Sequence, residues 1–303
     1  MGKIAFVFSG QGDQYPGMGK ELYDNFAAAR EVFSQADALR PGTSEMCFGG
    51  SEADLKETKN TQPCMFAVEL AAAAVLREAG VRADMAAGFS LGELAALTYT
   101  GAVDFKTGFE LVCRRGELMQ SAAEEQPTAM AAVLRLSREE VERVCGQFSQ
   151  VYPVNYNCPG QISVSGAAGE MEAFYAAVKA AGGRAMPLKV KGAFHSPFMA
   201  PAADKFGEYL SRYSIGEPTI PLYSDCTGEP YGSNGKELLE RQICSPVLWE
   251  NIVRGAIAAG ADTFIELGPG KTLCNLIGKT DKTVRAFPVR NPGDVDAVLL
   301  EVK

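Results

Sequence analysis

The sequence Gly88-Phe89-Ser90-Leu91-Gly92 decides the fold. A short apolar run at 85–87 precedes it and an Ala/Leu-rich run at 93–97 follows it, which predicts a strand, a sharp turn and a helix in succession. On such a turn the serine oxygen is exposed, and the following backbone N–H groups and the helix dipole favour a developing negative charge. The pattern predicts a nucleophile elbow, and the alternative is a glycine-rich turn that happens to contain serine.

The composition is that of a globular protein, with 303 residues, 47% hydrophobic and 22% charged. This length suits one large domain with an insertion, or two domains. A net charge of −8 argues against a nucleic-acid binder. None of the eight cysteines forms a CxxC pair, so we expect neither a metal nor a redox cofactor. We find no signal peptide and no apolar stretch long enough for a membrane, and scattered cysteines suit a reducing compartment, so we expect a cytoplasmic protein.

The N-terminal residues 3–8 have the pattern of a buried strand, and the strand leads into Gly10-Gln11-Gly12. A dinucleotide-binding loop is excluded, because Tyr15 occupies the place of its third glycine. Either the glycine pair lets a backbone N–H or the Gln11 amide approach another loop closely, or the segment is a plain tight turn.

Residues 105–120 form a predicted helix in which one arginine lies on the apolar face. That face is formed by Leu111, Val112, Leu118 and Met119. Arg115 lies in its middle, whereas Arg114 lies on the polar face. Arg115 either extends its guanidinium to solvent or pairs with a buried or bound anion, and a carboxylate is the anion that guanidinium matches best.

From residue 130 onward the pattern becomes strand, helix, strand, strand, helix, strand. The predicted elements are strand 130–136, helix 138–148, strand 151–156, strand 161–165, helix 170–181 and strand 184–190. This βαββαβ order is that of the ferredoxin-like motif. We therefore predict a small subdomain at 127–191, inserted into a larger α/β subdomain formed by 1–126 and 192–303.

His195 is the only histidine in the chain, and it lies directly before Ser196-Pro197, where a helix is predicted to begin and to run to residue 210. The positive end of that helix would favour a neutral imidazole, as a general base requires. A lone histidine is more often structural than catalytic. If Ser90 is a nucleophile, however, it needs a base, and this chain offers one imidazole.

Seven motifs in the right order resemble the malonyl-CoA:acyl-carrier-protein transacylase family. They are Gly10-Gln11-Gly12, residues 88–93, Arg115-Gly116, Asn157 with Pro159-Gly160-Gln161, Phe194-His195-Ser196, Arg241-Gln242 with Pro246-Val247, and residues 266–270. The resemblance implies an α/β-hydrolase-like large subdomain with a ferredoxin-like insertion. It also implies a ping-pong transfer, in which Ser90, activated by His195, takes malonyl from malonyl-CoA and passes it to the phosphopantetheine thiol of an acyl carrier protein.

The resemblance also implies roles for other residues. The backbone N–H groups of Gln11 and Leu91 would form the oxyanion hole, and Arg115 would bind the malonyl carboxylate. The backbone carbonyl of Gln242 would orient the histidine, as the family has no acidic third member of a catalytic triad.

Three further positions are candidate substrate-binding residues. Phe194 would block an α-methyl group, by resemblance to polyketide acyltransferases. Asn157 matches a family residue near the histidine. Phe89 departs from the family, which usually has histidine before the nucleophile, and this departure bears on acyl specificity and rate more than on reaction type.

The expected partner is an acyl carrier protein. Because carrier proteins are usually acidic, we expect Lys189, Lys191 and nearby basic residues to form the docking patch. A monomer serving fatty-acid or polyketide synthesis is expected. The alternatives are an acyltransferase for another acyl-CoA, a serine thioesterase or other hydrolase, and a catalytically weak module that binds carrier protein. Arg115 on an apolar face argues against a lipase-type hydrolase, and Ser90 with His195 argues against an inactive module.

Overall fold

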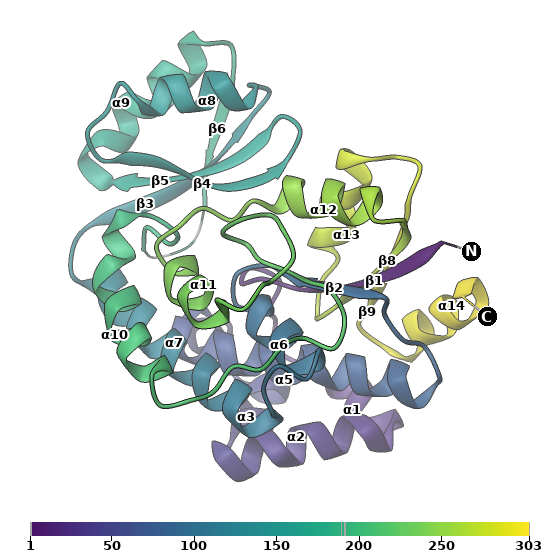
Figure 1. The fold of residues 1–303 in the computed structure, drawn as a ribbon. Coiled ribbons are helices and arrows are strands. Elements are labelled where there is room, and N and C mark those ends of the chain that lie inside the picture. The colour runs from purple at the N-terminus through teal and green to yellow at the C-terminus, as the bar shows by residue number, and fades with distance from the viewer. Residues whose placement is uncertain (1, 189, 191, 303) are drawn as a thin grey trace.

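A parallel sheet of five strands organises the larger part of the computed structural model, which describes residues 2–188, 190 and 192–302 (Figure 1). The strand order is β7-β2-β1-β8-β9, and all neighbours are parallel. The strands are β1 (Lys3–Phe8), β2 (Met85–Gly88), β7 (Leu222–Tyr223), β8 (Ala261–Leu267) and β9 (Arg285–Val289). The parallel sheet and the α/β class agree with the sequence prediction.

The two faces of this sheet have separate cores, because side chains alternate along each strand. Phe6 and Phe8 point into one core, whereas Ala5 and Val7 point into the other. The first core is covered by α1 (Lys20–Asn25), α2 (Ala27–Leu39), α3 (Thr43–Gly49), α4 (Glu52–Lys56), α5 (Thr58–Glu78), α6 (Gly92–Tyr99), α7 (Phe105–Glu124), α10 (Ala200–Leu210), α11 (Gly235–Gln242) and α14 (Pro292–Val302). The second is covered by α12 (Trp249–Ala258) and α13 (Thr272–Thr280).

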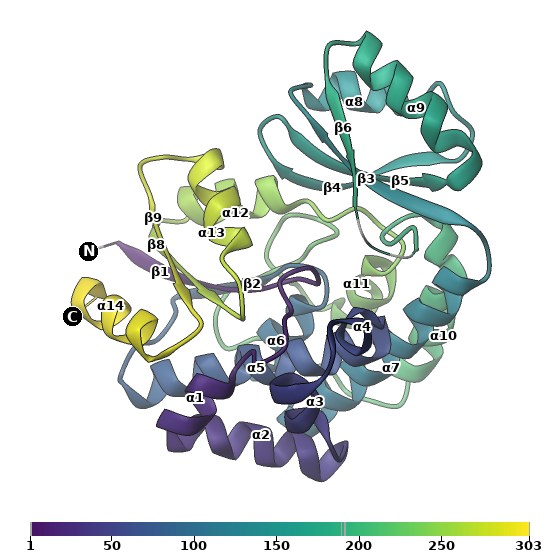
Figure 2. The same cartoon turned by 180° about the vertical axis from the view of Figure 1, so that it is seen from behind.

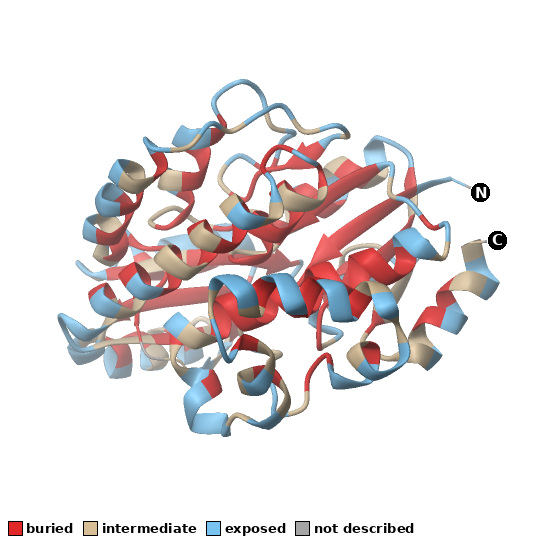
Figure 3. Cartoon of the chain, turned by 90° about the horizontal axis from the view of Figure 1, so that it is seen from below, coloured by how far each residue is buried: buried red, intermediate tan, exposed pale blue. Residues whose placement is uncertain are grey.

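The long helix α5 is buried along most of its length, since its residues are apolar or small on nearly every face. Figure 3 shows the same contrast across the molecule: the strands of the large sheet are buried, and the outer faces of the surface helices are exposed.

A second sheet of four antiparallel strands stands beside the large one (Figure 2). Its order is β4-β5-β3-β6, and its strands are β3 (Thr128–Leu134), β4 (Val151–Cys158), β5 (Gln161–Ala167) and β6 (Arg184–Pro187). Helices α8 (Arg138–Cys145) and α9 (Ala168–Ala180) pack on one face of it through an apolar core of their own. The predicted βαββαβ order of elements is confirmed.

Several predicted boundaries differ from the observed elements: the helix expected at 138–148 ends as α8 at Cys145, and two further boundaries lie beside prolines. The strand expected at 184–190 ends as β6 at Pro187, which has no N–H to donate, and beyond it only the Leu188 N–H still donates to β3, to the Met130 carbonyl at 2.9 Å, among the described residues. The helix expected from Pro197 begins as a single 3-10 turn, η1 (Pro197–Met199), and the α-helix starts only at Ala200, where Pro201 falls in its first turn. Lys189 and Lys191, expected in a docking patch, lie outside the described residues.

The two sheets are joined at the free edge of β4. Val247, in the loop between α11 and α12, accepts a hydrogen bond from the Tyr156 N–H at 2.9 Å and donates one to the Val154 carbonyl at 2.9 Å. Across the same junction the Lys279 Nζ donates to Gln161 Oε1 at 3.0 Å. The edge of the small sheet is therefore covered by the segment that follows Gln242. Within the described residues, no helix combines the length and apolarity needed to cross a membrane.

Candidate active site

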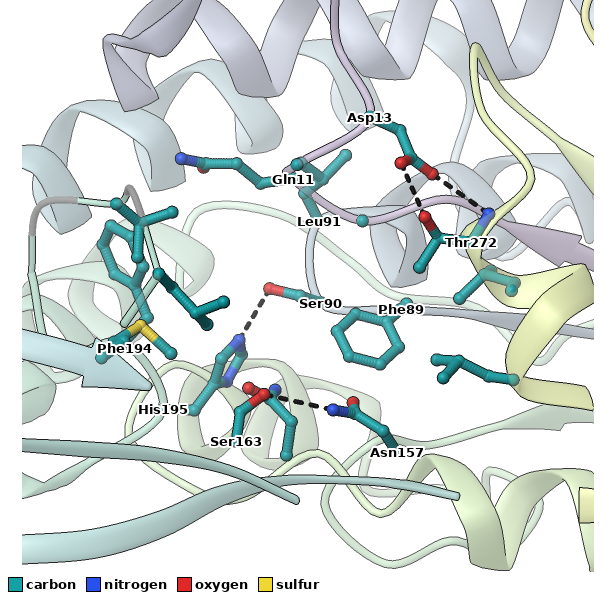
Figure 4. A pocket seen from close by; sticks show the side chains of 18 of the residues that line it. Gln11, Asp13, Phe89, Ser90, Leu91, Asn157, Ser163, Phe194, His195 and Thr272 are labelled. Atoms are coloured by element: carbon teal, nitrogen blue, oxygen red, sulfur yellow. Dashed lines mark hydrogen bonds between the residues drawn. The ribbon is translucent and has the colours of Figure 1, made fainter. Parts of the chain in front are cut away.

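Ser90 lies on a strained turn between β2 and α6, with a backbone φ of 57°. Both flanking glycines are required by close approach. A Cβ on Gly88 would lie 2.0 Å from the Gly92 carbonyl carbon, and a Cβ on Gly92 would lie 2.4 Å from the Phe8 carbonyl oxygen. The crowded backbone thus fixes the turn, and the Ser90 side chain extends toward His195 (Figure 4). Residues 88–92 therefore have the backbone geometry of a nucleophile elbow.

His195 connects the serine to a backbone carbonyl. Its Nε2 lies 2.7 Å from Ser90 Oγ, and its Nδ1 lies 2.9 Å from the Gln242 carbonyl oxygen. Because a carbonyl can only accept, Nδ1 must carry the ring proton, which leaves Nε2 free to accept the serine proton. The imidazole can therefore take the proton of the hydroxyl, while the carbonyl holds the ring in the orientation that this transfer needs.

The imidazole is buried and is held neutral. Its pKa is lowered from 6.5 to about 4, chiefly by burial and then by the charge of Arg115, against the opposing effect of the hydrogen bond to Gln242. The sequence analysis expected a neutral ring because of a helix dipole. Burial and the charge of Arg115 replace that cause, since the α-helix α10 begins only at Ala200, after the short turn η1.

Arg115 lies directly beneath the nucleophile and is only 1% exposed. Its Nη2 donates to Ser90 Oγ at 3.1 Å and to Gln242 Oε1 at 2.7 Å, and its Nη1 donates to Gln62 Oε1 at 2.9 Å. All three acceptors are uncharged. Burial lowers the pKa of Arg115 to about 10, so it remains a cation at neutral pH. The alternative in which Arg115 extends to solvent is wrong.

The loop Gly10-Gln11-Gly12 lies against the elbow. A Cβ on Gly10 would be 2.7 Å from a ring carbon of Phe89, so this loop and the elbow are in direct contact. Among the described residues, the backbone N–H groups of Gln11 and Leu91 have no acceptor, and both residues line the cavity above Ser90. The contacts favour the close-approach interpretation at Gly10, whereas Gly12, with a φ of 132° and no atom within 4 Å of an added Cβ, fits a plain turn.

Ser90 opens into a cavity of about 260 Å³ between the two sheets. On one side of the serine lie Phe194, Met119 and Met130, which belong to the first core of the large sheet. On the other side lie Phe89 and Leu276, which pack with the second core. Figure 4 shows Phe194 and Phe89 on opposite sides of the Ser90–His195 pair. The cavity therefore has two parts that meet at the nucleophile.

Asn157 and Phe89 line the cavity, but neither contacts the imidazole through a hydrogen bond. The Asn157 Nδ2 donates to Ser163 Oγ at 3.1 Å. The Phe89 ring lies 5.5 Å from the Trp249 ring, tilted by 60°. The structure thus brings Ser90, His195 and Gln242 together by hydrogen bonds, and it places these two residues in the wall.

The sequence analysis did not assign the polar groups beneath the elbow. Asp225 Oδ2 accepts the Ser90 N–H at 2.7 Å, and the Gln242 Nε2 donates to Glu93 Oε2 at 2.6 Å. Gln62, which holds Arg115, was also missed. One signal could have indicated Asp225: it lies two residues after the end of β7, and sites lie at the carboxyl ends of the strands of a parallel sheet.

His195 already contacts Ser90 Oγ and could take its proton as the oxygen attacks an acyl group. The ester that forms would then lie beside the buried cation Arg115. This arrangement is that of enzymes that carry an anionic acyl group on serine. Residues 5–293 match the acyl transferase domain family. Along its whole length the chain is 38% identical to the malonyl CoA-acyl carrier protein transacylase of Bacillus subtilis (strain 168), of which it covers 98%. The chain belongs to the malonyl CoA-acyl carrier protein transacylase family.

Solved structures agree in fold. The malonyl CoA-acyl carrier protein transacylase of Clostridium perfringens ATCC 13124 has a TM-score of 0.96 and 38% identity, with 99% of this chain and 97% of that chain covered. A malonyl-transacylase solved in complex with the holo acyl carrier protein of a type II polyketide synthase has a TM-score of 0.95 and 33% identity, with 99% of both chains covered.

Proposed function

We propose that this protein transfers a malonyl group from malonyl-CoA to the phosphopantetheine thiol of an acyl carrier protein, through a malonyl ester on Ser90. One observation carries the proposal: a buried guanidinium donates to the nucleophile itself, with Arg115 Nη2 at 3.1 Å from Ser90 Oγ. An acyl group on this serine lies beside a cation, which favours a group that ends in a carboxylate. The named activity of the relatives supports the same donor and acceptor.

The first half-reaction loads the serine. His195 Nε2 takes the proton from Ser90 Oγ as the oxygen attacks the thioester carbonyl, and the N–H groups of Gln11 and Leu91 hold the resulting oxyanion. The intermediate collapses with loss of the CoA thiolate, which takes the proton from His195. In the second half-reaction the phosphopantetheine thiol gives its proton to His195, attacks the ester carbonyl, and releases Ser90 with that proton.

Arg115 sets specificity in this scheme. Acylation removes the Ser90 hydroxyl as an acceptor, and the freed guanidinium N–H pairs with the malonyl carboxylate. An acetyl group offers no such acceptor, so the buried Arg115 stays unsatisfied in its complex. Phe194 limits the space for an α-methyl group. Phe89 and Asn157, on the other side of Ser90, line the path of the pantetheine arm.

We also propose that the chain forms two subdomains. We describe 1–126 with 192–303 as an α/β-hydrolase-like subdomain, supported by the elbow on a parallel sheet, and 127–191 as a ferredoxin-like subdomain, supported by its strand order. The proposed steps need no cofactor, because serine, imidazole and guanidinium supply the chemistry. The eight free thiols suit a cytoplasmic enzyme, and we expect it to act as a monomer.

Intact-protein mass spectrometry tests this function. The wild type and a Ser90→Ala variant are mixed briefly with malonyl-, methylmalonyl- or acetyl-CoA, and holo acyl carrier protein is then added. We expect a malonyl adduct on the wild type alone, which discharges onto the carrier protein. Discharge to water instead of carrier protein would indicate a hydrolase, and an adduct from acetyl- or methylmalonyl-CoA in preference to malonyl-CoA would overturn the roles of Arg115 and Phe194.

A further inference from the structure

Two carboxyl groups lie side by side beneath the elbow, and neither has a role in the steps above. Glu93 belongs to α6 and Asp225 follows β7, and both are 0% exposed. They approach the site from below: Asp225 Oδ2 accepts the Ser90 N–H at 2.7 Å, and Glu93 Oε1 accepts the Tyr231 hydroxyl. Two fully buried carboxylates would be costly without compensating charges or donors, so the protonation state of the pair has to be determined.

In the described part of the chain, the donors around the pair serve only three of its four oxygens: the Tyr231 hydroxyl, the Ser90 N–H, the Asp225 N–H (3.4 Å from Glu93 Oε2) and the Gln242 amide. The Gln242 Nε2 has two hydrogens but three oxygens within reach: Ser90 O at 2.7 Å, Glu93 Oε2 at 2.6 Å and Asp225 Oδ2 at 3.1 Å. Among the described residues, Asp225 Oδ1 has no partner. A proton on the pair removes one of the two buried charges that these donors would otherwise have to stabilise.

The charges around the pair also indicate that it carries one proton. Burial raises the pKa of both acids, and for Asp225 the charge of Glu93 and a hydrogen bond to it raise the pKa well above its usual value. Among the neighbouring titratable groups, Arg115 is a cation, and His195, Tyr231 and Cys226 are neutral. The charge of Arg241 acts on Cys226. With one proton the pair carries a single negative charge, which balances Arg115. With two protons it would leave Arg115 uncompensated, and with none it would repel an anionic acyl group.

The pair also stabilises the orientation in which the Gln242 amide oxygen faces Arg115. Arg115 can only donate, so Gln242 presents its oxygen to the guanidinium, 2.7 Å from Nη2. The amide nitrogen then faces Glu93, Asp225 and the Ser90 carbonyl, which all accept from it. The backbone carbonyl of the same residue holds His195. One residue thus transmits the position of the acids to both the cation and the base.

We propose that Glu93 and Asp225 share one proton and act together, through the Gln242 side chain, as positioning residues that hold Arg115 ready for the carboxylate of the acyl group. The effect on acyl selectivity rests on the proposed function, whereas the shared proton does not.

Infrared spectroscopy tests the proton directly. A protonated carboxyl group has a C=O stretching band separate from the carboxylate bands. We expect such a band in the wild type at neutral pH and its loss in Asp225→Asn. Glu69→Gln is the matched control, because Glu69 is another buried acid with a strongly raised pKa and lies outside this network. Its substitution should remove a different band and leave that of the pair. If Asp225→Asn removes no band, the shared proton is refuted.

Loading kinetics test the positioning role. In Glu93→Gln the new amide competes with Gln242 to donate, which favours rotation of the Gln242 amide away from its present orientation. We expect kcat/KM for loading by malonyl-CoA to fall at least about 10-fold more than for acetyl-CoA, with thermal melting confirming the fold. An equal loss for both donors would show that the pair only supports the fold. If the wild type itself loads no malonyl, the proposed function fails, and the infrared result still decides the shared proton.

Discussion

Arg115 Nη2 donates to Ser90 Oγ at 3.1 Å, while His195 Nε2 contacts the same oxygen from 2.7 Å. The nucleophile therefore touches a cation and a base at once. The cation stabilises the alkoxide character that develops on attack, and it lowers the pKa of the base. After acylation the guanidinium N–H loses this acceptor and becomes available to the acyl group. One side chain thus acts before and after the ester forms.

Replacing Arg115 should therefore affect malonyl loading far more than acetyl loading. In Arg115→Ala the malonyl carboxylate loses its partner, and we expect kcat/KM for malonyl-CoA to fall by about 100-fold or more. Arg114→Ala is the matched control, because Arg114 is 41% exposed and its contacts, with Glu117 and the Tyr209 ring, lie away from Ser90. It should load both donors at the wild-type rate. A parallel loss for both donors in Arg115→Ala would show that its role is structural.

The pH dependence of loading should report His195. The base must be neutral, and its pKa in the free enzyme is about 4, so the loading rate should be flat at neutral pH and fall as the pH drops through about 4. Arg115→Ala removes one cause of the lowered pKa, which should move this acidic limb to higher pH. Single-turnover loading between pH 3.5 and 8 measures both profiles; an unmoved limb would contradict the coupling.

The same shift makes folding pH-dependent, with a definite sign. The folded pKa of His195 lies below the unfolded value of 6.5, so the unfolded state binds the proton first as the pH falls. The stability contributed by the neutral ring is present above pH 6.5 and is lost toward pH 4, by about 3 kcal/mol at most. Urea unfolding of wild type and His195→Gln at both pH values isolates this contribution, since the difference between them should change in that window.

The glycines of the elbow should not tolerate even one methyl group. A Cβ on Gly88 would overlap the backbone at Gly92, so we expect Gly88→Ala to destabilise the fold by about 3 kcal/mol or more and to abolish loading. Gly169→Ala is the control: it lies in α9 with no atom within 4 Å of an added Cβ, and it should be neutral or slightly stabilising. Thermal melting compares the two, and a stable Gly88→Ala protein would refute the packing argument.

Phe194 should control the size of the acyl group. It is buried in the wall of the cavity beside Met119 and Met130, so Phe194→Ala should open space there and raise methylmalonyl relative to malonyl loading. Phe198→Ala is the control, because Phe198 packs on Tyr152 outside the cavity wall. Competition between the two donors, read by mass spectrometry, gives the ratio, and an unchanged ratio would remove Phe194 from the specificity determinants.

Much of this arrangement could be predicted from local sequence. The strands at 3–8 and 85–87 follow from short apolar runs that precede glycine turns, and the place of Arg115 on an apolar face follows from its phase on one helix. His195 was found because no other histidine exists. Each of these signals lies within one segment of the chain.

The rest depends on contacts between distant segments. Gln62 lies 53 positions from Arg115, and Asp225 lies 135 positions from Ser90. No spacing rule connects such residues, because they meet only when α5, α7 and the end of β7 converge below the elbow. The cause of the lowered His195 pKa was missed for the same reason: burial and the Arg115 charge are properties of the assembled core.

The hydrogen bonds between Val247 and the edge of β4 have a consequence for protein engineering. The small sheet looks like a module that could be excised from the chain and replaced by a short linker, or exchanged for that of a relative. However, the loop that it holds begins just after Gln242, whose carbonyl orients the catalytic ring, and Ser165 of β5 donates to the Phe194 carbonyl at 3.1 Å, directly before that ring. In a chimera, the small sheet must therefore be exchanged together with residues 192–196 and 242–247, because these segments contact one another and position the catalytic ring.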